Sequence, residues 1–560
     1  MSVPTTSDHD TTASMQTEKL QSDTEPEHAS SSTQQQSTTY ASGVPLILIS
    51  LGLVLAVFCL GLDRSIITTA IPKITNDFNS LEDVAWYGSA YLLTTCCFQL
   101  MFGKLYVEFK VNWVFLVALA LFEIGSLVCG CAPNSVALII GRAIQGIGCA
   151  GVMTGALTII AQSVPLHVRP MYTGVIGATS GIAQIIAPTL GGVLTDRATW
   201  RWCFWINLPL GAVTAVVVLF FVRLPPQKKQ EDHTGIFKKL DLEGTAIFMP
   251  CIICLLLALE WGGLTYAWSN WRIILCLCLF VVLFLVWLYV QYVKGDRGTL
   301  PLRIVTQRSV ASGMVYVLGA SGALFVITYY VPIWFQSVKG ASAEKSGINF
   351  LAASGAMTVG AVLSGALTSG IGYYVPQMFG SSIIMSIAAG LIYRYNLDTT
   401  TAYWAGTLVM FGFGTGMGLQ MPLTAVQTVL KGSDIAIGTS VVVLAQTLSG
   451  TVFLAVGQNL FQTNLVSALV ADASDVDPAA VLANGVSDLS SFITKTYGSA
   501  AINGVLKAYN AALRQSFIVC IALSCFMIIG ASFMEWKSVK KESMKDQQQD
   551  SPLARISSVV

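Results

Sequence analysis

The stretch Val136-Ala-Leu-Ile-Ile-Gly141-Arg142-Ala-Ile-Gln145-Gly146-Ile-Gly148 opens a run of 28 residues, 136–163, with a single charged side chain. A helix needs about 20 predominantly apolar residues to cross a hydrocarbon core of ~30 Å, so this run predicts a membrane span. Arg142 lies within it, where insertion scales give a charge a cost of at least ~2.5 kcal/mol. A charge retained at that cost is a candidate for function.

The rest of the chain is similarly apolar. Of its 560 residues, 54% are hydrophobic and 11% charged, whereas soluble domains carry about 25% charged residues. The sequence therefore predicts an all-α membrane protein in contact with the lipid bilayer. We expect fourteen spans, with boundaries soft by several residues, at 45–63, 84–106, 112–131, 136–163, 170–194, 202–223, 243–260, 271–292, 309–336, 346–369, 373–393, 402–427, 436–460 and 514–534.

Several classes of function have no support in the sequence. A net charge of +1 without a basic stripe argues against a nucleic-acid partner. The phosphate loop Gly-x4-Gly-Lys-Ser/Thr is absent, so we expect no ATP drive. Cys251 and Cys254 have CxxC spacing, but they lie within a span without a second pair, so we expect no metal or redox site. No nucleophile–base constellation indicates an enzyme, and we expect no cofactor.

The distribution of cations predicts the topology. An even number of spans places both termini on one side. Of the 31 Lys and Arg residues, 19 fall on that side, 11 on the other, and Arg142 within a span. The positive-inside rule then makes both termini cytosolic. Residues 1–40 are rich in Ser, Thr and Gln, and we expect them to be disordered.

Spans 7 and 8 read as an insertion between two six-span halves, a 6+2+6 arrangement. A weak internal sequence similarity supports this, because Gly141 to Gly148 of span 4 and Gly412 to Gly418 of span 12 are similarly rich in glycine. The expected parts are a disordered cytosolic tail at 1–43, a six-helix bundle at 44–223, a two-helix insertion with cytosolic linkers at 224–308, a second six-helix bundle at 309–536 with an external loop at 461–513, and a cytosolic tail at 537–560.

Three ionisable residues are candidates for proton coupling. Arg142 lies six residues into span 4, which is ~9 Å deep at 1.5 Å per residue. Asp63 closes the expected outer end of span 1 and Glu123 lies near the middle of span 3. Because an arginine cannot release its proton, its expected role is to pair with a carboxylate that can. The alternative is a static ion pair that only fixes helix packing.

Span 5 carries small residues and a proline. Gly177 and Gly181 are four residues apart and share one face, which allows a close helix contact. Pro188 removes a backbone hydrogen bond, and Gly191 and Gly192 follow it. A closely packed, bendable helix suits a moving interface, and packing alone is the other interpretation.

Polar and aromatic side chains recur within the spans. Glutamines that faced lipid would be costly, so we expect them to face other helices or a cavity. The candidates for substrate contact are Tyr91, Gln145, Gln184, Tyr329, Tyr330 and Gln446.

Five motifs give the chain a family resemblance. Leu62-Asp63-Arg64-Ser65, Gly141-Arg142-Ala-Ile-Gln145-Gly146 and Gly181…Pro188…Gly191-Gly192 resemble three signatures of the major facilitator superfamily. Thr199-Trp200-Arg201-Trp202 to Asn207-Leu-Pro209 is similar to a signature of its fourteen-span drug:proton antiporters. Tyr329-Tyr330-Val-Pro332 to Gly340 resembles fungal members that export toxins and drugs. In two departures, Val107 replaces the usual Asp of the 2–3 loop, followed by Glu108, and Ala187 replaces a usual Gly.

The resemblance implies a major facilitator fold and efflux of lipophilic small molecules in exchange for protons. It also implies a monomer in the cell membrane, with the vacuolar membrane as the alternative location. Two other functions stay open at this point. One is proton-coupled uptake of a small organic compound or metal chelate, and the other is a membrane receptor that does not transport.

Overall fold

The computed structural model describes residues 42–549 except 79, 81–82, 223–240, 264–265, 479, 482–488 and 499–500. Apart from one isolated bridge between Gly262 and Tyr266, all regular structure in this part of the chain is helical. The all-α prediction is confirmed. The N-terminal tail expected at 1–43 lies outside the described residues except for its last two positions.

Seven helices make up the first half, and they pack pairwise. α3 packs on α4, α2 on α4, and α1 on both α5 and α7. The predicted span 202–223 is broken at Ile206 into a short and a long helix. The helices are α1 (Val44–Phe78), α2 (Val84–Glu108), α3 (Val111–Gly130), α4 (Ser135–Ser163), α5 (Arg169–Arg197), α6 (Trp202–Trp205) and α7 (Asn207–Phe221).

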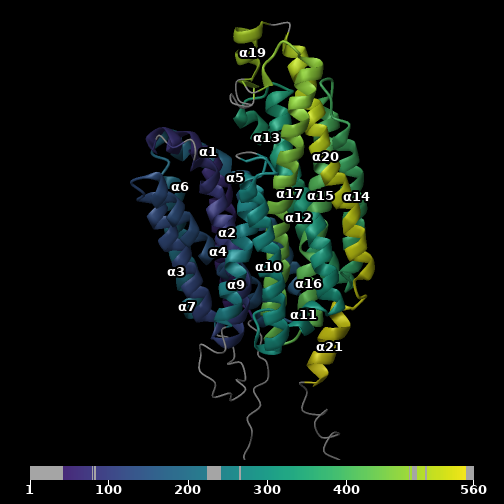
Figure 1. The fold of residues 1–560 in the computed structure, drawn as a ribbon. Helices are drawn as coiled ribbons and strands as arrows, with labels where there is room; N and C mark the ends of the chain where they lie inside the picture. The colour runs from purple at the N-terminus through teal and green to yellow at the C-terminus, as the bar shows by residue number, and fades with distance from the viewer. Residues whose placement is uncertain are drawn as a thin grey trace, which may run out of the picture. The chain divides into compact units, whose positions relative to one another are not determined.

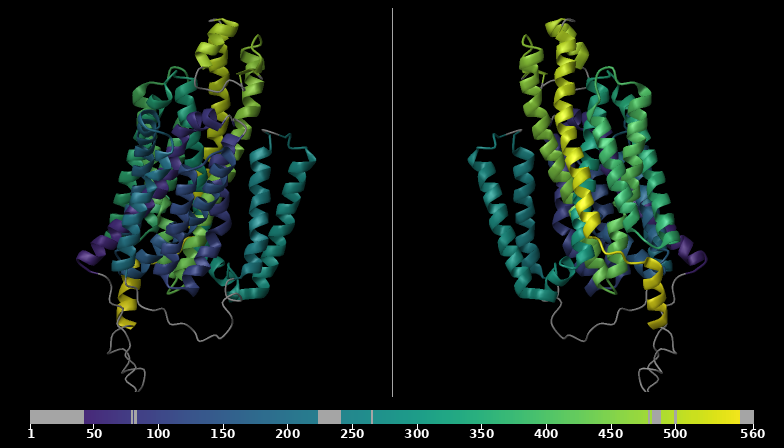
Figure 2. Two further views of the ribbon diagram at one scale, coloured as in Figure 1. Left: turned by 90° about the vertical axis from the view of Figure 1, so that its left-hand side faces the viewer. Right: turned by 90° about the vertical axis from the view of Figure 1, so that its right-hand side faces the viewer.

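The two helices of the expected insertion, α9 (Leu242–Trp261) and α10 (Trp271–Lys294), form a hairpin at the side of the bundle (Figure 2). Most of α10 is exposed, as expected for a helix that faces lipid. A connector of two short helices, η2 (Gly295–Arg297) and α11 (Leu302–Val305), leads to the second half.

The second half repeats the pairwise packing. α12 packs on α17 and α20, α13 on α15, and α14 on α15 and α20. The described tail adds α21, next to the end of α13. The helices are α12 (Arg308–Ser337), α13 (Ala343–Ile371), α14 (Val375–Tyr393), α15 (Thr401–Leu419), α16 (Met421–Val429), α17 (Asp434–Asp472), α19 (Leu489–Tyr497), α20 (Ile502–Phe533) and α21 (Val539–Gln549).

Thirteen helical segments of the described chain are long and apolar enough to cross a membrane. The remaining predicted span, 402–427, corresponds to α15 and α16, which follow one another with a break at Gln420. With that pair, the spans number the predicted fourteen. The boundaries expected for the five parts of the chain stay predictions.

Three helix ends lie well beyond the predicted ends of their spans. Span 1 was expected to end at residue 63, but α1 continues to Phe78, because Ile66, Ile67, Ala70 and Ile74 give the extension an apolar face that is buried. Asp63 is therefore an interior residue of α1. The loop expected at 461–513 is also shorter, because α17 runs to Asp472 and α20 begins at Ile502.

The two halves meet along two pairs of helices, α5 with α13 and α2 with α17. We call the end of the bundle that carries α21 the tail end and the end that carries α19 the far end (Figure 1). The closest approaches between the halves lie toward the tail end. A Cβ at Gly103 of α2 would overlap Ser440 of α17, and one at Gly365 of α13 would lie 2.5 Å from the carbonyl oxygen of Pro170. The halves are therefore tightly closed at the tail end.

Candidate functional site

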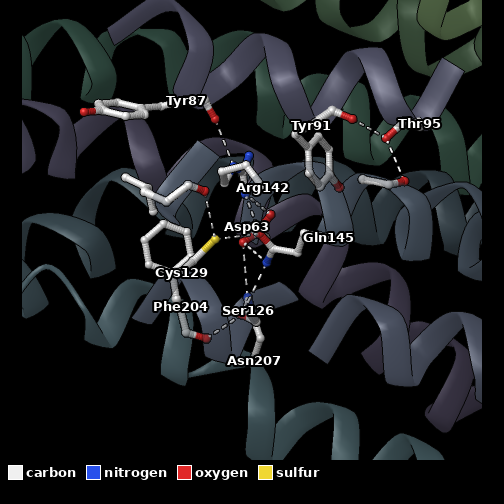
Figure 3. A network of polar contacts seen from close by, with 12 residues as sticks. Asp63, Tyr87, Tyr91, Thr95, Ser126, Cys129, Arg142, Gln145, Phe204 and Asn207 are labelled. Carbon is white, nitrogen blue, oxygen red and sulfur yellow. Dashed lines mark hydrogen bonds and ion pairs between the residues drawn. The ribbon is translucent and has the colours of Figure 1, made fainter. Parts of the chain in front are cut away.

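Asp63 of α1 and Arg142 of α4 form an ion pair inside the first half (Figure 3). The Nη1 atom of Arg142 donates to Oδ2 of Asp63 at 2.6 Å. Both side chains are buried, with exposed fractions of 1% for Arg142 and 0% for Asp63. Two charges in such a place are tolerable only when their remaining hydrogen-bonding groups also have partners.

Arg142 has those partners. Its Nε atom donates to the carbonyl oxygen of Tyr87 at 2.9 Å, and Nη1 also donates to Oε1 of Gln145 at 2.9 Å. The ring of Tyr91 lies against the guanidinium, with 4.4 Å from the Arg142 Cζ atom to the ring centroid. A planar, forked side chain can make these contacts at once, and a lysine cannot.

Asp63 is likewise surrounded by donors. Its Oδ1 atom accepts from Nε2 of Gln145 at 2.7 Å and from Nδ2 of Asn207 at 3.2 Å. The hydroxyl of Ser126 joins these two amides, because it accepts from Asn207 at 3.0 Å and from Gln145 at 3.2 Å. The same hydroxyl donates to the carbonyl oxygen of Phe204 at 2.8 Å. Four helices, α1, α3, α4 and α7, and the short α6 thus meet around one carboxylate.

Glu123 has the opposite surroundings. It lies three residues before Ser126 on α3, so the two side chains share one face of the helix. Both of its carboxylate oxygens are buried, and neither has a hydrogen-bond partner in the described part of the chain. A Cβ at Gly211 of α7 would overlap the carboxylate, so glycine is the residue that leaves room for it. The site therefore contains two carboxylates in different surroundings. Asp63 accepts three hydrogen bonds, and Glu123 accepts none from the described residues.

The structure places the six residues predicted to contact substrate in different surroundings. Gln145 is fully buried in the Asp63 cluster, and Tyr91 is buried against Arg142. Tyr330 is buried and donates to Oε1 of Gln458 at 3.0 Å, whereas Tyr329 is 47% exposed. Gln184 and Gln446 are half-buried and donate to the carbonyl oxygens of Ser180 and Leu419. For all six residues, contact with substrate stays a prediction.

The small-residue face of α5 points at the second half. A Cβ at Gly177 would lie 2.8 Å from the Gln420 side chain, and one at Gly181 would lie 2.6 Å from Oγ1 of Thr358 on α13. Gly191 instead approaches Ile66 and Thr69 of α1, and Gly192 has open space beside it. Pro188 lies inside α5, which stays helical through it. Gly177 and Gly181 thus lie at the interface of the halves, and a role in movement stays a prediction.

Sequence reasoning missed Ser126, Asn207 and the carbonyl group of Tyr87. Asn207 falls in a motif that the sequence analysis quoted, and an asparagine inside an apolar span is a usable signal. Ser126 gives no comparable signal, because serine is common in membrane helices. A backbone carbonyl gives none at all.

Comparison with known proteins shows which family this chain resembles. A sequence model described as "Major Facilitator Superfamily" matches residues 53–455. The MFS-type efflux pump MFS1 of Trichophyton rubrum is 47% identical over 512 residues, which cover 91% of this chain and 95% of that protein. The efflux pump aflT of Aspergillus parasiticus is 47% identical over 90% of this chain and 98% of its own length. The efflux pump roqT of Penicillium rubens is 46% identical over 89% of this chain and 92% of its own.

Solved structures agree on the fold. The human organic anion transporter MFSD10 matches with a TM-score of 0.55 at 13% identity, over 86% of this chain and 100% of that one. The proton:xylose symporter XylE also matches with a TM-score of 0.55 at 13% identity, over 87% and 94%. The predicted major facilitator fold is confirmed.

Proposed function

Because this chain belongs to the major facilitator superfamily, we propose that it exports lipophilic small molecules across the membrane in exchange for protons. Support for export comes from relatives with efflux pump in their names, matched over nearly their whole length. Another relative, 42% identical, is named an aspyridones efflux protein, which suggests a fungal secondary metabolite as the substrate class. The cell membrane is the proposed location, and a monomer the proposed state.

One observation supports the proton as the driving ion. Among the described residues, the buried carboxylate of Glu123 has no hydrogen-bond partner, whereas the nearby Asp63–Arg142 pair is fully hydrogen-bonded. A buried carboxylate that lacks donors and cations is costly in its charged form. Glu123 therefore fits its slot as the neutral acid. Asp63, which accepts three hydrogen bonds from donors that include a guanidinium, fits its site as the anion.

These surroundings suggest separate roles for the three ionisable residues. Arg142 and Asp63 form a fixed ionic core that joins α1 and α4. Glu123 takes up a proton when the site faces the outside and releases it when the site faces the cytosol. Once ionised, its carboxylate needs donors or water, which the slot beside Gly211 does not offer, so proton loss favours a rearrangement of α3 against α7. Rocking of the two halves about their interface then exposes the substrate to the other side.

Transport by the purified protein in liposomes tests this proposal, with rhodamine 6G and related lipophilic dyes as probes. A proton gradient should drive dye uphill in the direction opposite to the protons. Glu123→Gln should abolish this gradient-driven flux but retain dye–dye exchange, which needs no net proton movement. Asp63→Asn should impair both. Dye flux in the same direction as the protons would refute export, and wild-type gradient-driven flux in Glu123→Gln would refute the assignment of Glu123.

A further inference from the structure

The α9–α10 hairpin lies on one of the two seams between the halves. α2 of the first half and α17 of the second contact each other directly, and α9 packs on both. The hairpin has polar contacts with each of these helices near both of its ends, and the contacts differ in strength.

At the far end, the hairpin is fixed to α17 through one asparagine. Nδ2 of Asn459 donates to the carbonyl oxygen of Gly262 at 2.9 Å, and its Oδ1 accepts from Nε1 of Trp268 at 2.7 Å. Both polar atoms of the amide are therefore used. The turn approaches closely at Gly263, which has φ +79°, and a Cβ there would overlap the Asn459 amide.

At the tail end, the hairpin is fixed to α17 through the connector. Buried Asp241, at the start of α9, accepts from Nζ of Lys294 at 2.7 Å and from the backbone N–H of Thr299 at 2.8 Å, which ties α9, α10 and the connector together. Arg303 of the connector then makes a forked contact with Asp434 in the first turn of α17, at 2.6 and 2.9 Å.

The polar contacts of the hairpin and its connector with α2 are single hydrogen bonds. Between the two ends, Sγ of Cys97 donates weakly to the carbonyl oxygen of Met249 at 3.8 Å. Oγ of Ser89 donates to Oε2 of Glu260 at 3.1 Å near the far end. Nζ of Lys104 donates to the carbonyl oxygen of Asp296 at 3.1 Å near the tail end. Arg303 makes two charge-assisted bonds to one carboxylate, whereas Lys104 makes one to a carbonyl oxygen, so the contact of Arg303 is the stronger. When α2 and α17 separate, the contacts on the α2 side should break first.

We propose that the hairpin moves with α17 as one body and holds α2 by two latches that open in alternation. Glu260 and Ser89 form the latch at the far end, and Asp296 and Lys104 form the latch at the tail end. Opening the tail end of the transporter breaks the second latch and leaves the first closed, and opening the far end does the reverse. The seam between α2 and α17 then stays covered in both states. This inference depends on the rocking of the halves in the proposed function.

Distances between spin labels on the full-length protein test the proposal. The exposed cysteines Cys131, Cys278 and Cys525 are first replaced by serine. Labels then go on exposed positions of the first half, hairpin and second half: Val136, Trp271 and Val470 at the far end, and Trp113, Tyr292 and Phe533 at the tail end. A second state is forced by Gly103→Trp, because α2 has no room for a side chain against Ser440 when the tail end is closed.

In Gly103→Trp, the Trp113–Phe533 distance should lengthen, which reports opening of the tail end. The Tyr292–Phe533 distance should stay unchanged, and Trp113–Tyr292 should lengthen by about the same amount as the first pair. At the far end, Trp271–Val470 should stay unchanged. Lengthening of Tyr292–Phe533 with a constant Trp113–Tyr292 distance would mean that the hairpin follows the first half, which overturns the inference and leaves the export proposal intact. No change in Trp113–Phe533 would contradict rocking itself.

Asn459→Ala gives a second readout, because it removes the far-end attachment of the hairpin to α17. The Trp271–Val470 distance distribution should broaden in this variant. Asn464→Ala is the matched control, because Asn464 is half-buried on the same helix and donates to its own turn at Leu460. Equal distributions in both variants would overturn the role of Asn459 as an attachment point.

Discussion

The carboxylate of Glu123 and the α-carbon of Gly211 meet so closely that no side chain fits between α3 and α7 at this point. The contact isolates the carboxylate from water, and neither of its oxygens finds a donor among the described residues. Glu123 thus occupies a narrow space between α3 and α7. It lies near a second acid, Asp63, that is fully hydrogen-bonded.

The first prediction concerns Gly211→Ala. The added methyl overlaps the Glu123 carboxylate, and overpacking of a core typically costs about 1–3 kcal/mol. The thermal unfolding temperature of the purified variant in detergent should fall. Gly192→Ala is the control, because a Cβ there meets nothing within 4 Å. Adding Glu123→Ala to Gly211→Ala should restore the unfolding temperature without restoring gradient-driven flux. Equal unfolding temperatures for Gly211→Ala and wild type would contradict the close contact.

The second prediction concerns Arg142→Lys. A lysine keeps the charge but cannot contact Asp63, Gln145 and the Tyr87 carbonyl together. Hydrogen bonds to charged groups are worth about 1.5–3 kcal/mol, so we expect gradient-driven dye flux to fall about tenfold or more. Dye binding at equilibrium, measured in parallel, should persist. Arg272→Lys at the exposed start of α10 is the control. Arg142 is a packing residue only if Arg142→Lys transports like wild type.

Much of the fold could be predicted from the sequence because a bilayer leaves few choices. Long apolar runs in a bilayer form helices, because the backbone hydrogen bonds must be made within the segment. The runs around Arg142 and in α10 are examples. Helix ends were less predictable. α1 continues past Asp63 because its next residues are polar on one face and buried on the other, and a search for continuous apolar residues overlooks that pattern.

The site was predicted in part, for a physical reason. Asp63 and Arg142 stand out because each is a charge in an apolar context, and the structure brings them together. The bond from Gln145 to Asp63 was not predicted, because sequence spacing gives the face of a helix and not the neighbour opposite it. The role of Ser126 could not be predicted from the sequence, because it depends on the side-chain amides of Gln145 and Asn207 that donate to its hydroxyl.

The third prediction concerns pH and Asp241 at the base of the hairpin. Burial acts to raise the pKa of this carboxyl, but hydrogen bonds from Lys294, Thr299 and Gln291 outweigh it and leave the pKa below its usual range. A group with a lowered folded-state pKa stabilises the fold above its ordinary pKa of about 3.9, and this contribution is lost as the pH falls through the folded value. The unfolding temperature should therefore fall more steeply below about pH 4 in wild type than in Asp241→Asn.

Asparagine is a suitable replacement at this position. Asp241 has φ +45°, a left-handed conformation that asparagine tolerates, so the variant isolates the charge. At neutral pH we expect Asp241→Asn to be less stable by about 1–3 kcal/mol, since partners such as Lys294 lose an anionic acceptor. A difference between the two proteins that stays constant from neutral to acidic pH would show that the charge of Asp241 does not contribute.

The last prediction concerns the charge pair between Arg303 of the connector and Asp434 of α17. Val107, where the resemblance implies an acid, lies in the last turn of α2. The structure shows a charged contact at the same end of the bundle. An exposed pair of this kind is worth up to about 1 kcal/mol, roughly fivefold in an equilibrium constant. That is enough to shift a balance between two conformations without unfolding the protein.

Arg303→Asp and Asp434→Arg should each place like charges opposite one another and release the connector from α17. The connector carries Asp296, whose carbonyl oxygen accepts from Lys104 of α2, so its release should loosen the tail end. The measured outcome is faster thiol labelling of Ser440→Cys, a position buried against Gly103 when the tail end is closed, in the background without exposed cysteines. The double variant restores this pair with its charges exchanged, but the carboxylate introduced at position 303 faces Asp296, which Arg303 contacts at 2.6 Å in wild type. It should therefore label more slowly than either single variant and faster than wild type. Asp398→Arg, an acid outside this cluster, is the control for added positive charge. If the two single effects simply add in the double variant, Arg303 and Asp434 do not act as a pair, and tail-end closure depends on the contact between Gly103 and Ser440 alone.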